Sequence, residues 1–268
     1  MRGQTATIPF SLTRGLSFSV DIYNFAPIAA VLDAAYSVVT ALARLLEPVA
    51  GGGSAAIAIV LITLALRTAL IPVGVSQVRA EFTRRRIAPR LQEIQKKYRK
   101  NPELLQKKMM ELYTSEKASP LAGILPTLLQ APVLSVVYGL FILPTVNGHP
   151  NDLLGEQLFG ASLGTSLGHL VTTGAFSLDL LVYAGLLVVI AAVAFTQRRV
   201  ALRFAAPLPD DAAPAMARLN GWLSWLPFIT VVFAAIVPLA ATLYLTVTTS
   251  WTLVERVLLR RHLAPAAA

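Results

Sequence analysis

The run AAIAIVLITLALRTALIPVGV at residues 55–75 carries a single charge, the guanidinium of Arg67. At about 1.5 Å per residue, this run makes a helix of about 31 Å, which matches the hydrocarbon core of a bilayer. An arginine at such a depth costs roughly 2.5 to 3.5 kcal/mol on insertion scales unless it faces water or an anionic partner. The run therefore predicts a membrane-spanning helix with a functional arginine, the alternative being a side chain that reaches to the nearer membrane surface.

The composition of the whole chain is that of a membrane protein. Of its 268 residues, 55% are apolar and 14% are charged, whereas soluble domains carry about 25% charge. The chain has no cysteine and only three scattered histidines, which excludes disulfides and argues against a metal site. It shows no paired catalytic carboxylates, no nucleophile beside a base and no nucleotide-binding motif. We therefore expect no enzyme activity, no catalytic residue and no cofactor.

Further apolar runs predict four more spanning helices, at about 121–143, 176–196, 222–238 and 239–256. Pro238 marks the break between the last two, which are so short that we expect the bilayer to be thinner around them. Most of the 23 lysines and arginines lie at 79–117, at 198–218 and in the C-terminal tail, whereas the loop 144–175 has none. Because basic segments stay in the cytoplasm, we expect the N-terminus outside and the C-terminus inside.

Residues 27–47 predict a helix of a different kind. One face carries a polar stripe, formed by Asp33, Ser37, Thr40, Arg44 and Glu47. We expect this amphipathic helix to lie in the outer membrane interface, and a sixth span is the alternative. The chain then divides into an extracytoplasmic segment 1–53, a five-helix core 54–257 and a short cytoplasmic tail 258–268.

Residues 79–117 predict a cytoplasmic helical hairpin. Asn101 is a good N-cap and Pro102 suits a first helical turn, so one helix ends and another begins there. The segment has twelve basic and five acidic residues, a net charge of +7, which favours attraction to anionic headgroups. The alternative is a recruitment surface for a nascent chain, ribosome or translocation partner, with candidate residues Arg84, Arg85, Arg86, Arg90, Lys96 and Lys97.

Polar side chains on other spans are candidates to share a site with Arg67. Thr63 lies one turn before Arg67 on the same face, and Gln130 lies midway along the second span. On the fifth span, one side carries Tyr244, Thr248 and Trp251. For the threonines, the alternative is a structural hydrogen bond to their own or a neighbouring helix.

The segment 86–141 contains a distinctive series of residues: Pro89, Lys97-Tyr98, the run 109–113 (MMELY), Pro120-Leu121, Leu125-Pro126, Gln130 and Pro132. This series resembles the signature region of the YidC/Oxa1/Alb3 membrane protein insertases, and a looser likeness extends over about 27–257. The short form is similar to Gram-positive, and in particular actinobacterial, members, which implies a multi-pass protein of the bacterial plasma membrane. The chain departs from the family pattern at VPLA (237–240), at Glu255-Arg256 where paired glutamines are common, and in its short tail.

The resemblance implies five spanning helices around a polar groove, with an outer interfacial helix and a cytoplasmic hairpin. It implies groove positions for Arg67, Gln130, Tyr244 and Trp251. It also implies an insertase that takes the hydrophilic tails of nascent membrane proteins and releases their apolar segments to the lipid bilayer. A Sec translocon and the ribosome are candidate partners, although the short tail argues against ribosome docking through it, and no nucleic-acid specificity is expected. The alternative functions are a small-anion transporter or channel that uses Arg67, and a passive assembly scaffold.

Overall fold

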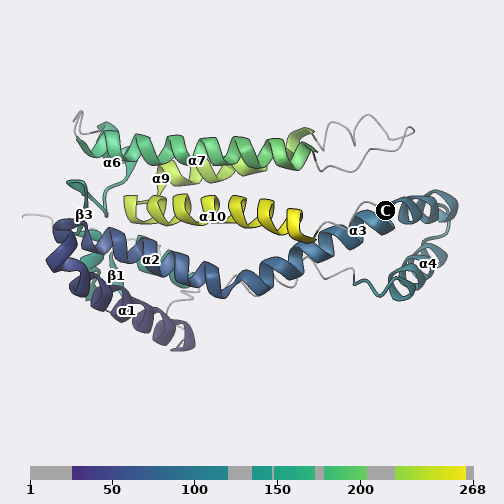
Figure 1. Cartoon of the computed structure of the whole chain (residues 1–268), viewed down its shortest axis with the longest axis horizontal. Coiled ribbons are helices and arrows are strands. Elements are labelled where there is room, and N and C mark those ends of the chain that lie inside the picture. The colour runs from purple at the N-terminus through teal and green to yellow at the C-terminus, as the bar shows by residue number, and fades with distance from the viewer. Residues whose placement is uncertain (1–25, 120–134, 147, 173–177, 204–220, 264–268) are drawn as a thin grey trace, which may run out of the picture.

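The computed structural model of the chain describes residues 26–119, 135–146, 148–172, 178–203 and 221–263. Most of these residues form long helices that lie side by side, as Figure 1 shows. The longer helices of the described ranges are α1 (Ala26–Ala50), α2 (Ser54–Ala69), α3 (Ile71–Tyr98), α4 (Pro102–Ser115), a helical stretch at 135–142, α6 (Leu167–Thr172), α7 (Leu178–Arg203), α9 (Ile229–Ile236) and α10 (Leu239–Leu263). One-turn helices lie at η3 (Asp152–Leu154) and η4 (Leu226–Phe228), the latter just before α9. The helical fold predicted from the sequence is confirmed.

Two short antiparallel hairpins gather at one end of the helices (Figure 1). They are formed by β1 (Thr145–Val146), β2 (His149–Pro150), β3 (Gln157–Leu158) and β4 (Ala161–Ser162). The loop after β4 covers the start of α10: the backbone N–H of Leu239 donates to the carbonyl of Thr165 at 3.0 Å, and that of Ala240 to Leu163 at 2.8 Å. These bonds satisfy N–H groups that the first turn of a helix leaves without intrahelical partners.

α1 and α2 form a helical hairpin around the one-turn helix η2 (Gly51–Gly53). Gly51 has a φ of +52°, a conformation that glycine adopts readily, and it permits the sharp reversal. α1 buries one face, which includes Leu32, Val39 and Ala43. The predicted polar stripe is largely exposed, and α1 also exposes a row of large apolar side chains at Val31, Val38, Leu45 and Val49. This helix therefore has a buried, a polar and an exposed apolar face.

α3 continues almost directly from α2, with a break at Leu70. The break precedes Ile71-Pro72 at the start of α3, where the missing N–H of proline is tolerated. As expected, Asn101 caps α4, its side-chain oxygen accepting from the N–H of Leu104 at 3.1 Å. The predicted hairpin thus consists of a long α3 and a shorter α4, which extend away from the β-hairpin end (Figure 1).

α10 lies at the centre of the structure, between α7 and α9 on one side and α2 and α3 on the other (Figure 1). The predicted break at Pro238 is confirmed, since α9 ends at Ile236 and α10 begins at Leu239. α10 then continues for 25 residues, to Leu263. At about 1.5 Å per residue this is about 37 Å, and the helix continues beyond its predicted end at about 256. The sequence predicted the end where the apolar run ends, because the last turns of α10 carry charged residues. The thinner bilayer around the last two helices stays a prediction.

The outer faces of the helices are strongly apolar. Large exposed side chains line α7 and α9, among them Leu181, Val188, Ile229, Val232 and Ile236. Among the described residues, Pro27–Ala69 and Leu178–Arg203 are long and apolar enough to cross a membrane, and Gly221–Ile236 is a shorter apolar helix. An apolar surface of this extent is typical of a protein that contacts lipid. The number of spans stays a prediction.

Candidate functional site

Arg67 lies in the last turn of α2 and points toward α10. Its Nε donates a hydrogen bond to the hydroxyl of Thr248 at 2.8 Å. Thr248 is buried and Arg67 is half-buried. The structure therefore brings together two of the predicted site residues, which lie 181 positions apart in the sequence.

A small polar cleft opens beside Arg67, between α2, α3 and α10. Its volume is about 170 Å³, and its lining residues are Arg67, Leu70, Gly74, Gln77, Val78, Thr252, Glu255, Arg256 and Leu259. A cavity of this size and polarity has room for several water molecules. An arginine on an apolar helix therefore has a polar environment within the protein.

Glu255 is a functional candidate that the sequence reasoning missed. The Glu255-Arg256 pair had registered only as a departure from the family pattern. In the structure, the Glu255 carboxylate packs directly over Gly74 on α3. It lines the same cleft as Arg67, and Arg67 and Arg256 both act on it electrostatically. The cleft thus holds charges of both signs.

Two other predicted site residues, Thr63 and Tyr244, line a separate apolar cavity. This cavity has a volume of about 560 Å³ and lies between α1, α2, the 135–142 helix and α10. The Thr63 hydroxyl donates to the carbonyl of Ile59 on its own helix at 2.6 Å. The ring of Tyr244 packs against Phe141, with 6.0 Å between ring centroids. Neither side chain joins Arg67 in the polar cleft.

Trp251 lies one turn before Glu255 on α10. Its indole Nε1 is buried and makes no hydrogen bond to any described residue. The indole nevertheless lies close enough to the Glu255 carboxyl to interact with it. Gln130 lies outside the described residues. No cluster of His, Cys, Asp or Glu within the described ranges could hold a metal ion.

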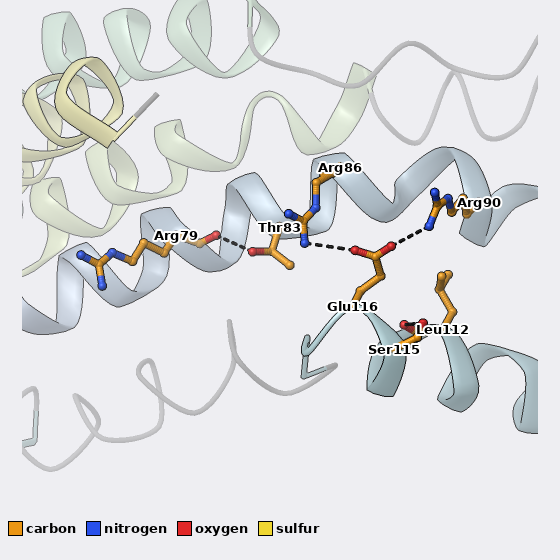
Figure 2. A network of polar contacts seen from close by, with 7 residues as sticks. All are labelled: Arg79, Thr83, Arg86, Arg90, Leu112, Ser115 and Glu116. Atoms are coloured by element: carbon orange, nitrogen blue, oxygen red, sulfur yellow. Dashed lines mark hydrogen bonds and ion pairs between the residues drawn. The ribbon is translucent and has the colours of Figure 1, made fainter. Parts of the chain in front are cut away.

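The basic hairpin uses part of its charge to hold its own shape. Figure 2 shows Glu116, just after α4, reaching Arg86 and Arg90 on α3, with N–O distances of 3.1 and 2.6 Å. Arg85 pairs with Glu81 at 2.7 Å. The remaining predicted recruitment residues, Arg84, Lys96 and Lys97, are exposed on α3.

A further ion pair lies within α4 itself. Lys108 and Glu111 are 2.6 Å apart at their charged atoms. The hydrogen bond from Lys108 holds the pKa of the Glu111 carboxyl below its ordinary value. The charge on this carboxylate is thus stabilised locally, on the exposed surface of the hairpin.

Comparison with known proteins places this geometry in a family. The family model described as "60Kd inner membrane protein" matches residues 46–266. The insertase YidC of Clostridium perfringens is 39% identical over 90 residues, which are 34% of this chain and 38% of the relative. For YidC 1 of Bacillus cereus the identity is 40% over 93 residues, 32% of this chain and 36% of the relative. For YidC of Fusobacterium nucleatum it is 33% over 133 residues, 41% of this chain and 64% of the relative.

Each of these matches spans less than two thirds of the relative's length. The family model, in contrast, covers most of the present chain. The resemblance in the segment 86–141 is therefore confirmed. The chain belongs to the 60Kd inner membrane protein family, that of the YidC/Oxa1/Alb3 insertases, whose members are not enzymes.

Proposed function

We propose that this protein is a membrane protein insertase that moves hydrophilic tails of nascent membrane proteins past Arg67 and releases their apolar segments to lipid. The observation that carries the proposal is the polar cleft at Arg67, set among helices whose outer faces are apolar. The names of the relatives, membrane protein insertases, support the same activity.

The chemistry of the cleft suits a passing polar chain. Arg67 attracts acidic groups more strongly than it would in bulk water, because the surroundings are less polar. The buried Thr248 hydroxyl orients Arg67, and the buried indole of Trp251 supports the Glu255 side of the cleft. Thr252 lines the cleft, and its hydroxyl replaces part of the hydration that the tail loses. Gln130 acts in the same way from the second span. Thr63 and Tyr244 line the adjacent apolar cavity and provide the wall along which the apolar segment moves toward lipid.

No nucleotide or cofactor enters this scheme. Burial in lipid of the client's apolar segment, about 20 residues, drives completion. For an acidic tail, the membrane potential adds about 2.3 kcal/mol per charge per 100 mV.

The membrane topology belongs to the same proposal. Five helices span the plasma membrane, in the core 54–257, with the loop 144–175 outside and the hairpin 79–117 in the cytoplasm. The three faces of α1 favour a position in the outer interface, where the exposed apolar row contacts lipid and the polar stripe contacts water. The exposed basic residues of α3 recruit the client and the anionic bilayer surface, with the Sec translocon and the ribosome as further partners.

The test is insertion by the purified full chain in liposomes, with a client whose short translocated tail is acidic. Arg67→Ala is expected to lower the insertion rate by roughly tenfold, since one charge of attraction is lost in a poorly screened site. Arg44→Ala is the matched control, because Arg44 lies on the exposed polar stripe of α1 outside the cleft. Wild-type insertion by Arg67→Ala would favour a passive scaffold, and anion flux through liposomes that contain only this protein would favour a transporter.

A further inference from the structure

α10 runs beside α2 and α3 in the same direction (Figure 1). Arg67 contacts Thr248, and Gly74 contacts Glu255. From the first pair to the second, each helix advances by seven residues. Positions seven apart lie on nearly the same face of a helix. Gly74 and Glu255 are thus the next layer after Arg67 and Thr248, about 10 Å further along.

The glycine at position 74 permits this layer. A Cβ atom there would lie 1.9 Å from Oε1 of Glu255 and 3.0 Å from its Cδ. The backbone at Gly74 is helical, so no unusual φ requires glycine. Glycine weakens a helix interior, and here the close approach of the carboxylate supplies the reason for it.

Glu255 contributes an acidic charge to the lining of the cleft. Further along the same seam, both carboxylate oxygens of Glu81 accept from Nη2 of Arg260 at 3.0 Å. Glu81 is therefore held in an ion pair between α3 and α10. Glu255, in contrast, lines the cleft together with Arg67 and Arg256. Its carboxylate lies between Arg67 and the end of the helices that carries α4.

We infer that Glu255 is a specificity-determining residue, which offsets the charge of Arg67 so that the cleft accepts polar tails carrying basic as well as acidic groups. This inference rests on the insertase function proposed above. An acidic tail reaches Arg67 only after it passes a like charge, whereas a lysine or arginine in the tail meets a carboxylate first. The cleft therefore discriminates less against basic tails than a cleft with Arg67 alone.

The experiment uses two clients that differ only in the translocated tail, which carries two aspartates in one and two lysines in the other. The readout is the ratio of acidic-tailed to basic-tailed insertion by the full chain in liposomes. Both clients are measured on one preparation, so that a partial loss of folded protein cancels. Glu255→Gln is expected to raise the ratio on the order of tenfold, from loss of a charge about 10 Å from Arg67 at an effective dielectric constant of about 20.

Two variants serve as controls. Glu255→Asp keeps the charge and is expected to stay within about twofold of the wild-type ratio. Glu93→Gln removes the same charge from an exposed position on α3 and is expected to leave the ratio at the wild-type value. An unchanged ratio in Glu255→Gln, or an equal rise in Glu93→Gln, would overturn the inference.

Arg67→Ala, run in parallel, separates the two proposals. If Arg67→Ala inserts the acidic-tailed client at the wild-type rate, the proposed groove fails, and the role of Glu255 fails with it. If Arg67→Ala is defective while Glu255→Gln keeps the wild-type ratio, only the role of Glu255 fails.

Discussion

Replacing Tyr183 by phenylalanine removes one hydroxyl from the point where α7 meets the break between α9 and α10. Tyr183 is fully buried, and its hydroxyl lies within hydrogen-bond distance of the carbonyl oxygens of Ala234 and Val237 and of the Thr242 hydroxyl. Pro238 has no N–H to donate to the carbonyl four residues before it, that of Ala234, and Val237 is the extended residue that follows α9. Side-chain hydroxyls supply the donors at both carbonyls. Tyr183 thus joins three helices through one group.

The size of the effect follows from counting donors. Tyr183 and Thr242 have one hydroxyl proton each. Thr242 can bond to the carbonyl of Ala234 at 2.8 Å, so Tyr183→Phe leaves the carbonyl of Val237 without its donor. A buried unsatisfied group costs about 1–3 kcal/mol, whereas hydrogen bonds between membrane helices average about 0.6 and reach about 1.7 kcal/mol. We expect the free energy of unfolding to fall by about 1–2 kcal/mol.

The assay is reversible unfolding of the purified protein in mixed micelles as the fraction of denaturing detergent rises. Tyr36→Phe is the matched control, because the Tyr36 hydroxyl accepts a 3.2 Å bond from the exposed N–H of Asp152. It is expected to change the free energy of unfolding by less than about 0.5 kcal/mol. Thr242→Val completes a double-mutant cycle with Tyr183→Phe, and the two effects should not be additive because both hydroxyls serve the same carbonyls.

Two results would refute this reasoning. One is a Tyr183→Phe variant as stable as the Tyr36→Phe control. The other is full additivity with Thr242→Val, which would mean that the two hydroxyls act independently. Either result would show that the end of α9 does not depend on donors from α7 and α10.

The other predictions concern α3. Gly74→Ala is expected to push the Glu255 carboxylate aside, because a Cβ atom at position 74 would lie 1.9 Å from its Oε1. Since this is the end of a flexible side chain and alanine favours a helix interior, the free energy of unfolding should change by less than about 1 kcal/mol. The ratio of acidic-tailed to basic-tailed insertion should shift toward that of Glu255→Gln, and a wild-type ratio would contradict the contact. Glu116→Gln breaks the ion pairs with Arg86 and Arg90, whose side chains are 66% and 67% exposed. The loss should be below about 1 kcal/mol in the unfolding measurement and should vanish at high salt, and a salt-independent loss would contradict it.

Much of the local structure follows from the order of residues alone. The apolar run 55–75 predicts a spanning helix, and Asn101 and Pro238 mark boundaries, because capping and helix breaking depend on residues close in the chain. The signature in 86–141 was enough to indicate the family. Arg67 was a functional candidate from its depth in an apolar run, and this also needs only local composition.

The composition of the site depended on how the helices pack. The periodicity of α2 and of α10 shows which residues share a face of each helix, but not the register between two helices about 180 positions apart. That register pairs Arg67 with Thr248 and seats Glu255 on Gly74, while it leaves Thr63 and Tyr244 at an apolar cavity. Sequence determines the faces because they are local. Packing determines which faces meet, because the contact between Arg67 and Thr248 forms only when distant parts of the chain have folded together.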